Sequence, residues 1–233
     1  MKSKYLAAVA ALVVAGGAHA ASATFSFNLP AVGNNAVRPP YPTVATLTLV
    51  DVAGGVQFTL DPNEASSGFA GDASSEFVER LTLAYGGVEP LSFSNVAGAA
   101  LRDFSFGSQG HLDAGYASNG NVLSFDWFSS RRDGANRFDI TESSAWNLFG
   151  DGLDVSDFTS AFGTANNKPG PIHGVISVTG YDLDGVQPTP SNWVDGATVA
   201  AIPEPSTYAL MLAGLGAVAF MTRRRSVHAV NAR

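Results

Sequence analysis

Cysteine is absent from this chain of 233 residues. No disulfide bond can therefore cross-link the fold, and no thiolate can act as a nucleophile or a zinc ligand. Histidine is scarce as well, because only His111 and His173 lie between the two terminal segments. Neither belongs to an HExxH or comparable spacing, so the sequence gives no zinc site. We expect His173 to be satisfied by packing within a strand and His111 to lie on a surface loop.

Basic residues are also few in the central part of the chain. Residues 21–202 contain 7 Lys and Arg against 19 Asp and Glu, a net charge near −12. A protein that binds nucleic acid needs the opposite sign of charge to neutralise phosphates. The composition therefore excludes nucleic acid as a partner and suits a protein that stays soluble outside the cell.

The motifs of common hydrolases are missing too. There is no Gly-x-Ser-x-Gly elbow to single out a nucleophilic serine. Glycoside hydrolysis needs only a pair of carboxylates, and Glu76, Glu79 and Glu142 are the glutamates nearest to predicted strands. Glu76 and Glu79 differ by three positions, so a regular strand points them to opposite sides. We expect all three to be solvated surface residues, and we predict no catalytic residue and no enzyme.

The N-terminus has the layout of a secretory signal peptide. Lys2 and Lys4 form a basic region, and residues 5–17 form an apolar one. Ala18 and Ala20 place small residues at the two positions that signal peptidase reads. We predict a signal peptide over residues 1–20, forming a helix and cleaved after Ala20.

The C-terminus combines three elements within thirty residues. Pro203, Glu204 and Pro205 come first, residues 208–221 form an apolar run, and residues 223–225 are arginines. The prolines favour extended backbone that a protease can grip. The apolar run has 14 residues, or roughly 21 Å of helix, against a hydrocarbon core of about 30 Å. Such a short transmembrane helix suits presentation to a protease better than permanent anchoring.

This tail, about residues 201–226, resembles the PEP-CTERM sorting signal of Gram-negative bacteria, also labelled an ice-binding protein C-terminal domain. The resemblance rests on Pro203-Glu204-Pro205, the apolar span, and Arg223, Arg224 and Arg225 as the stop-transfer cluster. It implies recognition by an exosortase-type membrane protease and transient insertion in the membrane. It also implies removal of the hydrophobic tail and delivery to the cell surface or exopolysaccharide matrix. The alternative is a simple C-terminal anchor. The resemblance assigns no function to the domain before it.

Between the two targeting segments, the apolar pattern is mostly that of β-strands. Period-two alternation predicts an all-β domain over residues 21–199, followed by the sorting signal at 200–233. The strand candidates are residues 24–28, 44–52, 56–60, 77–85, 91–94, 104–106, 122–128, 137–141 and 172–181. Gly54 and Gly55 predict a tight hairpin between the second and third strands. We therefore predict an antiparallel β-sandwich or jelly roll, flanked by the signal helix and the transmembrane helix.

One segment has helical rather than β periodicity. Residues 154–162 place Val155, Phe158, Ala161 and Phe162 on one face, with Asp154 as the N-cap. Proline-rich segments lie at both margins of the domain, and the second leads to Trp193. A tryptophan is too large to leave in a free linker, so we expect this segment to pack back on the domain.

Two kinds of ligand site can be tested against these residues. Asp and Gly gather at 151–154 and 182–185, where carboxylates and carbonyls could hold Ca²⁺, although neither segment has the EF-hand pattern. We expect ordinary structural turns there, and no cofactor. Aromatic residues could form a shelf for sugar rings. However, Leu123, Phe125 and Trp127 share one face of a strand, which is more typical of a core.

The sequence therefore favours a non-enzymatic, exported protein of the cell surface or extracellular matrix. Exopolysaccharide is its candidate partner, together with the exosortase that processes it. The competing hypothesis is a secreted glycan-active hydrolase that uses an Asp/Glu pair. A third is a ligand-binding module with an exposed aromatic shelf.

Overall fold

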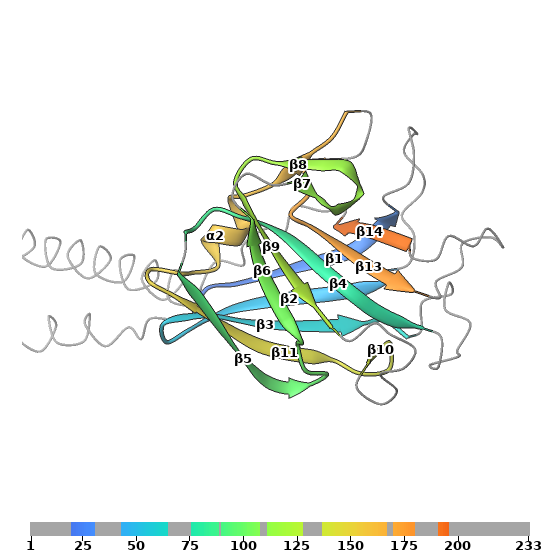
Figure 1. Cartoon of the computed structure of the whole chain (residues 1–233), viewed down its shortest axis with the longest axis horizontal. Coiled ribbons are helices and arrows are strands. Elements are labelled where there is room, and N and C mark those ends of the chain that lie inside the picture. The colour runs from blue at the N-terminus through green and yellow to red at the C-terminus, as the bar shows by residue number, and fades with distance from the viewer. Residues whose placement is uncertain are drawn as a thin grey trace, which may run out of the picture. The chain divides into compact units, whose positions relative to one another are not determined.

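The central part of the chain folds into antiparallel β-strands (Figure 1). In many of these strands apolar residues alternate with polar ones. The computed structural model describes residues 20–30, 43–64, 76–88, 90–107, 111–127, 137–166, 170–179 and, for the backbone, 191–195. Strand β2 (Ala45–Val52) illustrates the pattern: Leu47 and Leu49 are fully buried, whereas Thr46 and Thr48, which alternate with them, are only half-buried. Successive side chains of a strand point to opposite faces, so each strand offers one apolar face to a core.

Ten strands follow one another in a single hydrogen-bonded sheet. Their order is β5 (Leu91–Gly98), β11 (Ser144–Gly150), β3 (Gly55–Pro62), β2 (Ala45–Val52), β1 (Ser22–Pro30), β14 (Ser191–Asp195), β13 (Gly174–Thr179), β4 (Phe77–Tyr85), β9 (Asn121–Asp126) and β6 (Asp103–Gly107). The short strand β10 (Phe138–Asp139) pairs with the start of β4. A second, small sheet contains β12 (Gly163–Thr164), β8 (Tyr116–Ser118) and β7 (His111–Leu112).

The long sheet folds over so that its apolar face meets itself. Strands β11 and β9 lie far apart in the sheet order, yet the rings of Trp146 and Phe125 have centroids 5.1 Å apart. The Trp127 ring lies 5.5 Å from that of Trp146. At the two ends of the sheet, Phe93 of β5 and Phe104 of β6 are in edge-to-face contact at 5.4 Å. The aromatic core therefore joins strands that share no hydrogen bond.

The prediction of an all-β, antiparallel domain with one short helix is confirmed. Eleven of the described strands form one continuous folded sheet, where the expected sandwich would have two packed sheets, and three short strands form the small second sheet. The strands group into one compact unit, Ser22–Ala201. The predicted signal helix and transmembrane helix lie outside the described residues. Among the described helices, none is both long and apolar enough to span a membrane.

The predicted hairpin between β2 and β3 is present. Val52 pairs with Gly55, so the loop consists of Ala53 and Gly54. Gly54 has a φ of +79°, a conformation that glycine adopts without steric cost. Strand β3 begins at Gly55, one residue earlier than predicted.

The predicted helix is shorter than its apolar pattern suggested. Helix α2 spans Ser156–Thr159, with Val155 and not Asp154 at the N-cap position. Asp154 still contributes, because its Oδ1 accepts a hydrogen bond from the Ser156 N–H at 2.8 Å. Of the four residues predicted on one helical face, Val155, Phe158 and Ala161 are buried and Phe162 is half-buried, and both Ala161 and Phe162 follow the end of the helix. The Phe158 ring contacts that of Phe58 edge-on at 5.1 Å, so the helix covers one end of the aromatic core.

A second apolar cluster lies between the small sheet and the main sheet. Leu112 of β7 and Tyr116 of β8 are buried with Ala84 of β4, Val122 of β9 and Val175 of β13. The small sheet thus protects part of the long sheet's outer face from water.

Several strands lie outside the predicted set, among them the short strands β7, β8 and β12. Strand β11 was not predicted, yet it pairs with both β3 and β5. The segment around Trp193 forms strand β14 between β1 and β13, which agrees with its expected return to the domain.

Ser144 offers a test of the folded-over core. Its Oγ is fully buried, accepts a hydrogen bond from Trp127 Nε1 at 3.0 Å and donates one to the Ala99 carbonyl at 2.6 Å. Ser144→Ala removes the hydroxyl that bonds both the Trp127 Nε1–H and the Ala99 carbonyl, so it should lower the free energy of unfolding by about 1–3 kcal/mol. Denaturant unfolding measures this change. Ser143→Ala, at the exposed neighbour, should change stability by less than about 0.5 kcal/mol; equal losses would contradict the buried bridge.

Candidate binding site

A polar groove of about 400 Å³ opens where β2 begins and β3 ends. Six polar residues line it: Thr43, Thr46, Asp61, Asn63, Glu64 and Thr141. Pro62 and Ile140, which are buried, complete the lining. The groove therefore combines the β2–β3 strand ends with the turn after β10.

Hydrogen bonds beyond the strand ends hold the groove in shape. Pairing of Ala45 with Pro62 ends the β2–β3 ladder. The Asn63 N–H then donates to the Val44 carbonyl at 2.8 Å, and Asn63 Nδ2 donates to the Thr43 carbonyl at 2.9 Å. These bonds extend the paired geometry past the ladder, so Asp61 is presented from a fixed backbone.

The groove is acidic. Its lining includes the exposed carboxylates of Asp61 and Glu64, and the described lining residues include no lysine or arginine. Glu142 follows the lining residue Thr141. Burial raises the pKa of the Glu142 carboxyl, and the nearby Asp139 carboxylate raises it further. A ligand for this groove must accept hydrogen bonds from hydroxyls, donate them to carboxylates, or carry positive charge.

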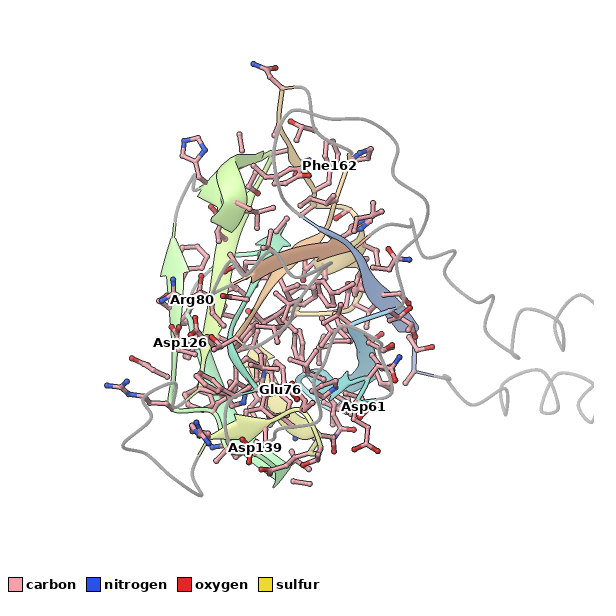
Figure 2. All side chains as sticks on the ribbon, turned by 90° about the vertical axis from the view of Figure 1, so that its right-hand side faces the viewer. Asp61, Glu76, Arg80, Asp126, Asp139 and Phe162 are labelled. Atoms are coloured by element: carbon pink, nitrogen blue, oxygen red, sulfur yellow. The ribbon has the colours of Figure 1, made fainter. Side chains whose placement is uncertain are left out.

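Charged residues also lie buried toward the same end of the strands. Figure 2 shows Asp61, Glu76 and Asp139 toward one end and Phe162 toward the other. Glu76 is only 1% exposed, and Arg137 is 8% exposed with its guanidinium 5.0 Å from the centre of the Phe77 ring.

The prediction that Glu76, Glu79 and Glu142 are all solvated surface is wrong for Glu76. Glu76 directly precedes β4, which pairs with β10 on one side and with β13 on the other, and its side chain is buried. Glu79 is half-buried and accepts a hydrogen bond from Thr179 Oγ1 at 2.6 Å. Glu142 is half-buried.

Carboxylates in and beside the 151–154 turn accept hydrogen bonds from nearby backbone N–H groups. Asp154 accepts from the Ser156 N–H, as described above. Asp157 Oδ2 accepts from the Asp154 N–H at 3.2 Å, and Asp51 Oδ1 accepts from the Val155 N–H at 2.8 Å. Within the described ranges, no group of three His, Asp or Glu side chains is arranged to hold a metal ion. Asp154, Asp157 and Asp51 therefore act as acceptors for the backbone here. The 182–185 turn lies outside the described residues.

The two central histidines lie in different environments. His173 is 7% exposed, and its ring centroid is 5.1 Å from that of Phe25, so the expected packing role is confirmed. His111 is exposed as expected, although it lies in β7 and not in a loop.

The aromatic residues tested for a sugar-binding shelf belong mostly to the core. Trp127, Trp146 and Tyr116 are each at most 1% exposed. Their rings are therefore unavailable for stacking on a ligand. The core prediction for Leu123, Phe125 and Trp127 is confirmed.

The described residues thus define an antiparallel β-domain with an acidic groove lined by hydroxyl groups. Its C-terminal segment, residues 201–225, is a PEP-CTERM protein-sorting motif. The motif implies export, processing by exosortase and attachment at the cell surface. No curated protein and no solved structure matches the chain.

The predicted sorting residues lie outside the described part of the chain. Pro203, Glu204 and Pro205 fall within the matched motif, as do the three arginines at 223–225. Ala18 of the predicted signal-peptidase site is also outside, whereas Ala20 is the first described residue and is exposed.

The raised pKa of Glu142 predicts a pH-dependent stability. A carboxyl whose pKa is higher in the folded than in the unfolded protein stabilises the fold below its unfolded pKa, and this contribution is lost as the pH rises through the folded pKa. Glu142→Gln removes the penalty on the charged form, so the variant should melt at a higher temperature than wild type at pH 7. The difference should disappear below about pH 4. Thermal unfolding at both pH values measures this, and a lower melting temperature at pH 7 would contradict it.

Proposed function

We propose that the mature domain is a non-enzymatic component of the cell surface or extracellular matrix that associates with exopolysaccharide. The sorting motif at residues 201–225 carries this proposal, because it implies an exported protein processed by exosortase. The excess of acidic over basic residues in the central domain supports it, since such a surface keeps a protein soluble and repels nucleic acid.

The groove supports a glycan as the ligand. Sugar hydroxyls both donate and accept hydrogen bonds, so they match a lining of threonine hydroxyls, the Asn63 side chain and two carboxylates. Asp61 and Glu64 would repel an acidic polysaccharide at close range. The lining therefore favours a neutral, hydroxyl-rich polymer.

The sorting triplet can be tested by substitution. Replacing Pro203, Glu204 and Pro205 together by alanine removes the residues that the processing protease would read. The unprocessed chain should then accumulate in the membrane fraction, and less than about a tenth should reach the surface. Quantitative immunoblots of fractionated host cells measure the distribution. The control, Pro188→Ala with Pro190→Ala, changes a nearby proline pair outside the motif and should leave sorting unchanged.

The proposed partner can be tested in a host that cannot make its exopolysaccharide. Wild-type protein should then move from the surface-bound matrix into the culture medium, because its ligand is absent. The processed C-terminus should be unchanged, since sorting does not depend on the matrix. Equal retention on cells with and without exopolysaccharide would contradict the proposed association.

A second candidate function is a glycan hydrolase that uses Asp61 and Glu64 as its acid pair. The observation in its favour is that both carboxylates line the same groove. An enzyme would release reducing ends from the host polysaccharide, and Asp61→Asn or Glu64→Gln would lower that rate by at least about a hundredfold. Our proposal predicts no release by wild-type protein at all.

A further inference from the structure

The outer face of strands β1, β2, β3 and β11 carries rows of uncharged polar side chains. These strands lie side by side in the sheet (Figure 1). One row runs through three threonines that oppose one another across the strands: Thr24, Thr48 and Thr59. A parallel row consists of amides and a hydroxyl: Gln57, Asn147 and Ser94 of β5. We call these six residues the hydroxyl–amide face.

The face is partly open to solvent, although Asn147 Oδ1 is buried within it, while the other side of the same strands is closed. Five of its six residues are half-buried and Ser94 is exposed. The residues that alternate with them, such as Leu47, Phe58 and Trp146, are fully buried. The open side is therefore the outer surface of the folded sheet.

Charge is distributed very unevenly over the sheet's outer surface. Among the described residues that point outward from these four strands, Asp61 is charged and the others are uncharged. The outer side of β4 and β9 differs, because Arg80 Nε bonds Asp126 Oδ1 there at 2.7 Å (Figure 2). A domain with a net charge near −12 thus keeps one broad surface almost neutral.

Neutral hydroxyl rows are well suited to binding a neutral polymer. Desolvating a hydroxyl costs far less than desolvating a charge, and the cost is recovered when a partner hydroxyl replaces water. Threonine is β-branched and has few χ1 rotamers, so its hydroxyl loses little freedom on binding. Because the three threonines lie on paired strands, their spacing is fixed before a ligand arrives.

The face continues directly into the acidic groove. Thr46, which lines the groove, pairs with Ser26 of β1 on one side and with Asp61 of β3 on the other. The threonine row lies two residues further along the same strands. A ligand that occupies the groove can therefore extend onto the face without crossing another element of the sheet.

We propose that the hydroxyl–amide face and the groove together bind one chain of a neutral polysaccharide. This inference rests on the proposed matrix function and specifies its ligand and surface. An acidic polysaccharide is disfavoured by Asp61 and Glu64, which lie at the groove end of the path. A protein partner would need large apolar or aromatic anchors at the centre of its interface. The apolar residues that the pairing places in these two rows, Val50 beside Gln57 and Ala145 beside Thr59, are small.

The test uses the mature, processed protein and exopolysaccharide purified from its host. Anion exchange separates this polymer into neutral and acidic fractions, and native affinity electrophoresis measures binding to each. The variant Thr24→Val, Thr48→Val, Thr59→Val removes three hydroxyls while keeping β-branched side chains and charge. The matched control, Thr164→Val with Ser105→Ala, removes hydroxyls from exposed positions on β12 and β6. Circular dichroism and melting temperature verify that both variants fold.

Wild-type protein and the control should bind the neutral fraction equally. The triple variant should bind it at least about tenfold more weakly, because three hydrogen bonds are lost. Equal binding by the triple variant would show that the hydroxyl–amide face is not the binding surface, while the proposed matrix function would be unaffected. Binding of the acidic fraction alone would contradict the proposal that the ligand is a neutral polysaccharide. Binding of neither fraction would overturn this inference and the proposed function together.

Discussion

The fold depends on the burial of aromatic rings between distant strands of one sheet. Phe58 stacks on Trp146 at 5.2 Å, and both contact Phe125 from the other half of the sheet. Aromatic pairs contribute both buried area and favourable ring geometry. An eleven-stranded sheet with one apolar face can bury that face only by folding over, since no layer of helices covers it in the described structure. Helix α2 then closes one end, with Phe158 against this cluster.

Once the apolar face is turned inward, the outward residues are free to serve function. The small sheet covers one part of the outer surface, and the remainder of strands β1, β2, β3 and β11 is left to polar side chains. The groove arises where β2 begins and β3 ends, because the turn after β10 lies against these two strands there. The domain thus provides the outer surface, and the sorting motif at residues 201–225 implies that the protein is delivered to the cell surface.

Local patterns predicted the strands whose residues alternate cleanly. Strand β4 has the predicted bounds, Phe77–Tyr85, and the β2–β3 hairpin follows from its glycines. Strand β11, Ser144–Gly150, was missed because it contains no β-branched residue and its serine, asparagine and glycine are more typical of turns. It is a strand because Trp146 and Leu148 find buried neighbours. Pairing with strands that are distant in the sequence makes such a segment a strand, and a local sequence pattern carries no information about that pairing. The groove was beyond prediction for the same reason, since it joins residues 43–64 with residues 140–141.

The most direct test of this account is to map both termini of the mature protein in its native host. Full-length chain would be expressed there, and intact-mass and peptide mass spectrometry applied to the membrane, surface and medium fractions. The account predicts a start at Ala21 and an end between about residues 203 and 207, found outside the membrane. An intact chain ending at Arg233 in the inner membrane would contradict it, because the domain would then be tail-anchored and would never reach the matrix.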